Sequence, residues 1–191
     1  MKTALTIISL ALLAIIGYLG YSGMFAKVQF TEQLFGGETL IYEEHIGDYS
    51  KVGPVMDEIY RRLKEEDGIE TEVGFGIYYD KPSEVPKEQL RSEVGCVLPP
   101  AFLDQAATLS DKYHLKVYPV QDCIVAELPY RNTTSIMLGV FKAYPALERL
   151  AEEKGYPANP VMERYDRVNR RIQYIMPIAP AEETDETAAR Q

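Results

Sequence analysis

A glutamate and a tyrosine two positions apart, Glu163 and Tyr165, combine residue types that can act together on a ligand. They lie in an apolar, strand-like run, and residues two apart in a strand point to the same face. A carboxylate desolvated beside aromatic rings attracts a delocalised organic cation, to which ring faces add roughly 0.5–2 kcal/mol. The alternative is structural, with Glu163 as a surface acid and Tyr165 as part of a core edge.

Metal and cofactor chemistry is poorly supported by the other reactive side chains. The two histidines, His45 and His114, have no cysteine or second histidine nearby at the spacing of zinc ligands. Cys96 and Cys123 each lie in an apolar run, so we expect buried thiols, with a disulfide as the alternative in an oxidising compartment. The Gly74–Gly76 segment lacks the third glycine of a dinucleotide loop. We expect no cofactor and no metal.

The same order of landmarks occurs twice along the chain. A tyrosine after a turn is followed by a helical pattern, a tyrosine–aspartate pair and an apolar strand ending in proline. Tyr49 and Tyr130 are 81 positions apart, and Tyr79 and Tyr165 are 86 positions apart. These offsets are similar enough for duplication and too uneven for a solenoid. We therefore predict one domain of two pseudo-symmetric halves, with a ligand cleft where they meet.

The elements that must position these residues form an α+β pattern. We predict two strand–helix–strand–strand units, at residues 38–99 and 115–178, joined by a connector at residues 100–114. Apolar residues recur at helical spacing from Val52 to Leu63 and from Ser135 to Lys154, and each run predicts an amphipathic helix with one buried face.

Prolines and a glycine set the expected boundaries in the second unit. The run from Leu115 to Leu128 predicts one strand, bent or bulged around Pro119. Pro145 lies inside the helical pattern, where it removes a backbone donor and clashes with the preceding turn, so we expect a kink or two helical pieces. Gly155 is the expected cap at the end of this helix.

The chain begins with a long uncharged segment. From Thr3 to Ala26 there are 24 residues without a charge, and at about 1.5 Å per residue such a helix crosses a hydrocarbon core about 30 Å thick. We predict a single-pass transmembrane anchor at residues 1–26, contacting the bilayer through residues 3–26, and a juxtamembrane linker at residues 27–37. A cleaved signal peptide is the alternative. The amino terminus and Lys2 precede this segment, whereas Lys27 follows it, and this balance favours an inside amino terminus, which places the domain on the extracytoplasmic side.

Charge argues against nucleic acid as a partner. The chain has 20 basic and 29 acidic residues and a net charge of −9, so it repels a phosphate backbone. The basic run from Arg167 to Arg171 lies between two strand patterns and reads as a solvated hairpin turn. Residues 179–191 are acidic and contain no aromatic residue, so we expect a disordered tail.

Four short motifs follow one another along the chain: Ile46-Gly47-Asp48-Tyr49, Tyr78-Tyr79-Asp80-Lys81-Pro82, Glu163-Arg164-Tyr165 and Tyr174-Ile175-Met176-Pro177-Ile178. Through these motifs the chain, from about Glu38 to Ile178, resembles the GyrI-like small-molecule-binding domains. The resemblance implies a cleft for organic, often cationic, ligands, with a carboxylate from the second half beside an aromatic wall. Glu163 matches that carboxylate, and the expected wall residues are Tyr165, Tyr79, Tyr49, Tyr130 and Tyr174.

After its amino-terminal span the chain also carries Tyr78-Tyr79-Asp80, Val85-Pro86, Val94-Gly95, Leu128-Pro129-Tyr130 and Tyr144-Pro145-Ala146-Leu147. With that span, these motifs resemble a family of single-pass animal receptors that link the endoplasmic reticulum to autophagy. The cargo role of that family is associated with a long tail carrying an aromatic–acidic–hydrophobic motif. The tail of the present chain has no aromatic residue. We therefore expect the anchored domain to be shared and the autophagy role not to be.

Three functions remain in competition at this level. The leading hypothesis is a membrane-anchored module that binds small organic, cationic or amphiphilic molecules without catalysis. The first alternative is an adaptor or receptor domain that docks a protein partner at a membrane. The second alternative is a hydrolase in which Glu163 acts as a base and Tyr130 or Tyr165 as an acid or orienting group.

Overall fold

The computed structural model describes residues 2–179 of the chain. Its strands are β1 Gln29–Phe35, β2 Thr39–Ile46, β3 Val73–Tyr78, β4 Arg91–Val97, β5 His114–Val117, β6 Gln121–Pro129, β7 Val161–Asp166 and β8 Arg171–Pro177. Its helices are α1 Lys2–Tyr21, α2 Val52–Glu66, α3 Ala106–Leu109 and α4 Thr133–Lys154, with 3₁₀ turns at Tyr49–Lys51, Lys87–Gln89 and Pro100–Gln105. The predicted α+β class is confirmed.

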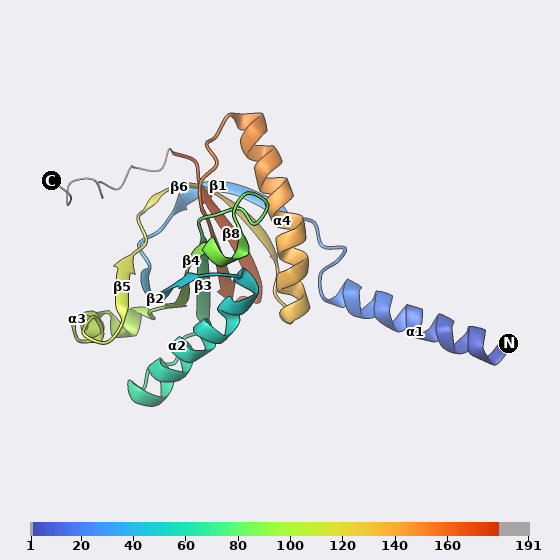
Figure 1. Ribbon diagram of the computed structural model, residues 1–191, viewed down its shortest axis with the longest axis horizontal. Coiled ribbons are helices and arrows are strands. Elements are labelled where there is room, and N and C mark those ends of the chain that lie inside the picture. The colour runs from blue at the N-terminus through green and yellow to red at the C-terminus, as the bar shows by residue number, and fades with distance from the viewer. Residues whose placement is uncertain (1, 180–191) are drawn as a thin grey trace.

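The strands form one curved antiparallel sheet with α2 and α4 against one face (Figure 1). The spatial order of the described strands is β1-β6-β8-β7-β3-β4-β2-β5. The segments β2-α2-β3-β4 and β6-α4-β7-β8 therefore form two neighbouring halves of the sheet, and these halves meet where β3 pairs with β7. In that pairing Gly76 lies opposite Glu163, and Gly74 lies opposite Tyr165. The central strand pair thus brings the two parts of the candidate site together.

The segment predicted as one bent strand at residues 115–128 is two strands at different places in the sheet, so this prediction was wrong. β5 pairs with β2, whereas β6 pairs with β1 and β8. Pro119 lies between them and has no backbone N–H with which to continue a ladder. The backbone N–H of Tyr118 instead donates to the carbonyl of Glu38 at 2.9 Å, which holds the crossing in place.

The predicted juxtamembrane linker also differs from the structure, because most of it forms β1. This strand pairs along its whole length with β6, from Gln29 opposite Glu127 to Phe35 opposite Gln121. Its side chains are nearly all exposed, so backbone hydrogen bonds stabilise it and no buried apolar pattern marks it. At Gly36, with φ of 140°, a Cβ atom would lie 2.1 Å from the carbonyl oxygen of Pro119.

Local signals explain the ends of the two sheet-packing helices. Asp48 accepts a hydrogen bond from the N–H of Ser50 at 3.0 Å and so caps the 3₁₀ turn that leads into α2. Asn132 and Ser135 cap the start of α4 reciprocally. Gly155 ends α4 in the left-handed conformation with φ of 69°, as predicted. The helix continues through Pro145, so the two-piece alternative was wrong; Pro145 lies on the exposed face, where water can satisfy the freed carbonyl.

The first helix, α1, leaves the domain beside α4 and on the side opposite α3 and β5 (Figure 1). All but its last residues are exposed, and it is the one helix of the described residues that is long and apolar enough to cross a membrane. A signal sequence near an amino terminus can also meet these criteria of length and hydropathy. The predicted acidic tail lies, apart from its first residue, outside the described residues.

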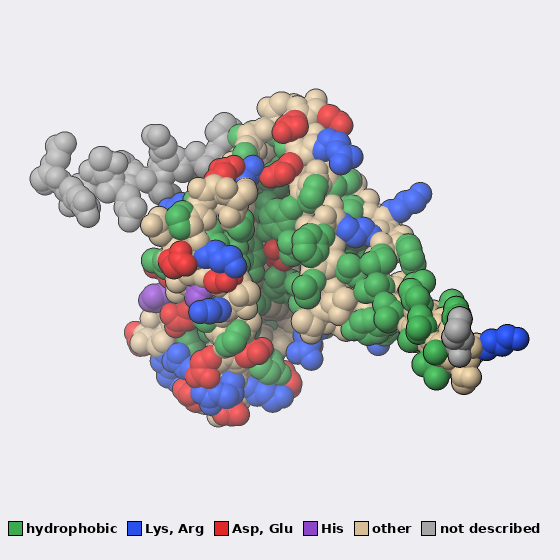
Figure 2. Space-filling view, turned by 45° about the vertical axis from the view of Figure 1, so that its right-hand side comes forward, with side chains coloured by type: hydrophobic (Ala, Val, Ile, Leu, Met, Phe, Trp, Pro, Cys, Tyr) green, Lys and Arg blue, Asp and Glu red, His purple; other side chains and the backbone are tan. Residues whose placement is uncertain are grey.

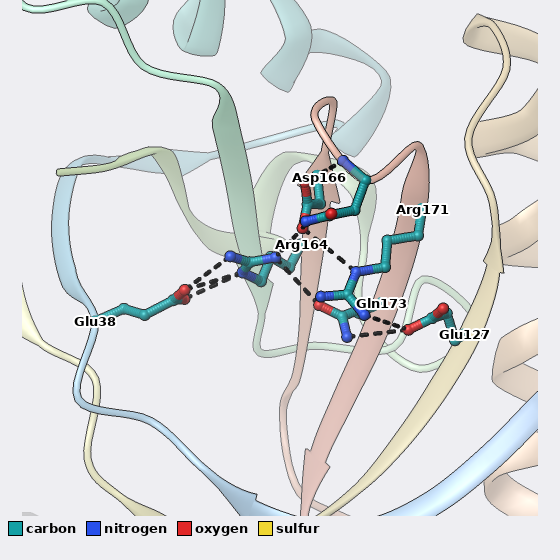
Figure 3. A network of polar contacts seen from close by, with 7 residues as sticks. Glu38, Glu127, Arg164, Asp166, Arg171 and Gln173 are labelled. Carbon is teal, nitrogen blue, oxygen red and sulfur yellow. Dashed lines mark hydrogen bonds and ion pairs between the residues drawn. The ribbon is translucent and has the colours of Figure 1, made fainter. Parts of the chain in front are cut away.

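A polar network lies on the sheet face opposite α2 and α4 (Figure 3). Arg164 of β7 donates to Glu38 at 2.9 Å and to Asp166 at 3.0 Å, and its side chain is 12% exposed. These contacts tie the central strand β7 to the chain that precedes β2. The network is completed by Gln173, Arg171, Glu127 and Asn169.

Candidate functional site

A cavity of about 1290 Å³ lies between α2 and α4 over the central strands. Figure 2 looks into this hollow and shows walls that are mainly hydrophobic. Helix α4 contributes one wall and α2 the other, and the floor includes Gly74 and Gly95. A Cβ atom at Gly74 would lie 3.2 Å from Cε of Met56, so the absence of a side chain there leaves room between the sheet and α2. The cavity is large enough for an organic molecule of drug-like size. Its apolar walls include Ile136, Val140, Leu147, Val52 and Met56.

Glu163 is the buried acid of this cavity. Its side chain points to the helix-covered face, and the residue is 4% exposed. Oε1 accepts a hydrogen bond from the hydroxyl of Tyr144 at 2.9 Å, and Oε2 accepts one from the hydroxyl of Tyr165 at 2.9 Å. Burial raises the pKa of Glu163 to about 7, although the two hydrogen bonds act in the opposite direction. Within residues 2–179 no Lys or Arg forms an ion pair with it.

Tyr78 of β3 extends the aromatic surroundings of this acid. Its hydroxyl lies in hydrogen-bonding contact with Tyr165, and burial raises the pKa of Tyr78. Its ring meets the ring of Tyr49 edge to face, with centroids 4.8 Å apart. The glycine at position 76 makes this arrangement feasible, because a Cβ atom there would lie 2.8 Å from the Tyr78 hydroxyl. Burial also raises the pKa values of Tyr144 and Tyr165, so these phenols stay protonated as donors.

The structure brings most of the sequence-predicted residues to the cavity, but not with equal roles. Glu163, Tyr165 and Tyr130 line it, and so does Tyr49, whose hydroxyl donates to the carbonyl of Arg91 at 2.8 Å. Tyr79 borders the cavity while its hydroxyl is hydrogen-bonded to Glu93 instead of Glu163.

Tyr174 does not line the cavity, although it lies directly opposite Glu163 in the β7–β8 pairing. It is fully buried behind Tyr144, and the two ring centroids are 5.8 Å apart. Its hydroxyl has no hydrogen-bond partner among the described residues. Helix α4 packs closely against this hydroxyl, because a Cβ atom at Gly139 would lie 2.2 Å from it.

This close approach gives a stability prediction. We expect Gly139→Ala to lower the free energy of unfolding by about 1–3 kcal/mol, because overpacking forces the Tyr174 hydroxyl to move. Tyr174→Phe alone should be nearly neutral, since the lost hydroxyl leaves no partner unpaired, and it should restore part of the loss in the double variant. Urea unfolding of the four proteins, followed by far-ultraviolet circular dichroism, measures this coupling. Strictly additive effects would contradict the contact.

Sequence reasoning missed Tyr144 and Tyr78 as site residues. Tyr144 shares the helical stripe of Val140 and Leu147, so its spacing was available as a signal. That spacing does not show that the hydroxyl reaches Glu163, because the rotation of α4 over the sheet decides it.

The raised pKa of Glu163 predicts a specific pH dependence of stability. The ordinary pKa is 4.5 and the folded-state pKa is about 7, so the folded chain binds more protons than the unfolded chain between these values. Stability must therefore fall as pH rises through that window, by about 3 kcal/mol for a pKa difference of about 2.5. Urea unfolding at a series of pH values should show a smaller fall in Glu163→Gln. An unchanged slope would contradict the assignment.

Two solved structures resemble this chain at low sequence identity. The crystal structure of the EcmrR C-terminal domain covers 81% of this chain and 99% of its own, with a TM-score of 0.56 and 14% identity. EcmrR in the cryo-EM structure of the EcmrR-DNA complex covers 92% of this chain and 67% of its own, with a TM-score of 0.58 and 16% identity. These likenesses show the shared fold.

Two curated relatives match by sequence. Testis-expressed protein 264 of Homo sapiens is 29% identical over 150 residues, which covers 74% of this chain and 44% of that protein. Its Mus musculus homolog is 27% identical over 150 residues, covering 74% of this chain and 45% of that protein. The chain thus spans less than half the length of these relatives.

A family model described as the GyrI-like small molecule binding domain matches residues 35–178. The match includes every strand except β1, of which it reaches only Phe35, together with α2, α4 and the buried acid between them. It therefore agrees with the resemblance carried by the motifs and with the solved structures of the same fold. The chain belongs to the GyrI-like small-molecule-binding domain family.

Proposed function

We propose that this protein is a membrane-anchored receptor that takes small lipophilic organic cations into the cavity between α2 and α4. The observation that carries the proposal is the buried carboxylate of Glu163, which has no basic partner in the described part of the chain. A buried carboxylate is stabilised in its charged form by a cation beside it. A ligand that brings a positive charge and an apolar body satisfies both the acid and the walls.

The aromatic side chains favour a delocalised cation over a compact ammonium ion. The hydroxyls of Tyr144 and Tyr165 already donate to Glu163, so the ligand need not supply hydrogen bonds. Ring faces of tyrosine attract a cation held within about 6 Å of the ring centroid. A delocalised cation also has a smaller desolvation free energy than a compact ammonium ion, and this favours its transfer into a cavity with apolar walls.

The helix α1 supports the second part of the proposal, the membrane anchor. Its 20 residues carry no charge after Lys2 and remain exposed except at the end next to the domain. A helix of about 20 apolar residues spans a bilayer. A reporter fused to the carboxy terminus tests the side of the membrane on which the domain lies.

Calorimetric titration of the full chain in lipid nanodiscs tests the binding function. Tetraphenylphosphonium serves as the lipophilic cation and triphenylphosphine oxide as a neutral molecule of similar shape, with empty nanodiscs as the blank. We expect saturable binding of the cation at one site and at least tenfold weaker binding of the neutral molecule, which corresponds to 1.4 kcal/mol or more. Equal affinities, or no binding above the blank, would contradict the proposal.

Hydrolysis is a second candidate, and the pKa of Glu163 is the observation that favours it. A general base is most effective when its pKa lies near the working pH, and the pKa of Glu163 is about 7. Glu163 would take a proton from the water that attacks a ligand ester, while a tyrosine hydroxyl stabilises the oxyanion. Turnover of a panel of ester and cyclopropane-bearing probes, lost in Glu163→Gln, supports this function. Absence of turnover across the panel rejects it.

A further inference from the structure

The end of α1 is fixed to the domain and not merely connected to it. Lys142 of α4 donates to the carbonyl oxygens of Gly23 at 3.2 Å and Met24 at 2.9 Å, and also to that of Ala26. These carbonyls belong to the turn that follows α1, so one ammonium group holds this turn against α4. Burial lowers the pKa of Lys142.

Two further contacts join α1 to the start of α4. The hydroxyls of Tyr18 and Thr134 are 2.8 Å apart, and Asn132 donates to the hydroxyl of Ser22 at 3.0 Å. Ser22 is buried in this junction. The direction of α1 therefore determines how α4 is presented to a bilayer that α1 crosses.

The amino-terminal half of α4 carries an apolar ridge on its exposed side, formed by Met137, Val140 and Phe141. Phe141 is 74% exposed and Met137 is 60% exposed, yet all three also border the cavity. At helical spacing they form the rim of the cavity on the side nearest α1. Figure 2 shows hydrophobic side chains continuing from the hollow across this face to α1.

The charges around the ridge differ in sign from the charge of the whole chain. The chain has a net charge of −9, but Arg131 lies over the ring of Tyr21, with 5.4 Å between its guanidinium carbon and the ring centroid. Exposed Lys27 follows α1, and Lys and Arg side chains border the base of α1 in Figure 2, whereas Asp and Glu side chains gather farther from it. Basic side chains next to an apolar surface suit the interface of an anionic membrane.

We infer that the ridge of Met137, Val140 and Phe141 rests in the interface of the bilayer that α1 crosses, so that the cavity opens at the membrane surface and takes its ligand from there. The occupant of the ridge is lipid, because the ridge is continuous with the spanning helix and is bordered by basic residues. The inference rests on the proposed anchor and adds the route by which an amphiphilic ligand enters.

Electron paramagnetic resonance of the full chain in nanodiscs, with and without phosphatidylserine, tests the inference. A nitroxide is attached to Phe141→Cys, and the matched control is Leu103→Cys, an exposed apolar position in the connector before α3. The native cysteines are buried. The same labelling reaction, carried out on the wild-type chain, measures how far they react. We expect the ratio of oxygen to nickel-chelate accessibility to be several-fold higher at position 141 than at position 103, and higher with phosphatidylserine.

Three results would overturn the inference. The first is an equal accessibility ratio at positions 141 and 103, and the second is failure of the chain to enter nanodiscs. The third is dipolar broadening between labels at position 141, which would show that a second copy covers the ridge. Cation binding by the unlabelled chain is measured separately by titration. Binding with an aqueous label at position 141 rejects the membrane contact and leaves the binding function intact. A lipid-exposed label at position 141 in a chain that does not bind the cation supports the membrane contact and rejects the binding function.

Discussion

Glu163→Gln is expected to weaken the binding of tetraphenylphosphonium by on the order of 100-fold, or about 2.7 kcal/mol. Glutamine keeps the size and one acceptor oxygen of the side chain, so the hydroxyl of Tyr144 or Tyr165 can still donate to it. What is lost is the negative charge in a site where burial makes a charge interaction strong. Titration calorimetry in nanodiscs measures the change.

The matched control is Glu65→Gln, which makes the same chemical change at a side chain 62% exposed on α2. Its effect on affinity should stay within about twofold, because exposed charges are screened by water and salt. Equal losses in the two variants would indicate a general charge effect. Unchanged affinity in Glu163→Gln would exclude Glu163 as the acid that holds the cation.

Arg164→Leu is expected to cause the largest loss of stability, about 3 kcal/mol, because it removes an ion-pair partner from the buried carboxylate of Asp166 and from the partly buried carboxylate of Glu38. The loss is at the lower end for a broken buried pair because Arg171 still contacts Asp166. The guanidinium group donates to Asp166, whose side chain is 2% exposed, and to Glu38. Burial opposes the ionisation of Asp166, but hydrogen bonds from Asn169 and the charge of Arg164 outweigh it and hold its pKa at about 2. Urea unfolding at neutral pH measures the loss.

Lowering the pH should remove the stabilisation that the ionised carboxylate of Asp166 provides, over a defined range of pH. The folded-state pKa of Asp166 is below its ordinary value of 3.8, so its contribution is complete above about pH 4 and disappears as pH falls through about 2. The control is Arg61→Leu on α2, whose bridges to Glu58 and Glu65 are exposed, and exposed bridges contribute about 0–1 kcal/mol. Equal costs of the two substitutions would contradict a structural role for the network.

The faces of the strands were largely predictable from the sequence. Alternation placed Glu163 and Tyr165 together, and their hydroxyl–carboxylate contact follows from that spacing. The position of Tyr174 could not be predicted from alternation alone. It shares the face of Glu163 through cross-strand pairing, but the close packing of α4 at Gly139 covers it. Periodicity gives the face of a residue, whereas tertiary packing decides what covers that face.

The elements that were missed have a common physical cause. β1 is stabilised by its backbone pairing with β6, and its exposed side chains give no apolar alternation. Similarly, the contact of Tyr144 with Glu163 depends on how α4 lies over the sheet. Both features depend on contacts between segments far apart in the sequence. The spacing of residues within one segment does not predict such contacts.

The central claim is that an ionisable, buried Glu163 holds a cationic ligand in the cavity, and the pH dependence of cation affinity tests it most directly. Because only the charged form attracts the ligand and its pKa is about 7 in the free protein, affinity should rise with pH up to about 7, by about tenfold per pH unit well below that value, and then level off. Glu163→Gln should bind weakly at every pH. An affinity in the wild-type chain that is the same at pH 5.5 and pH 8.5 would contradict the account.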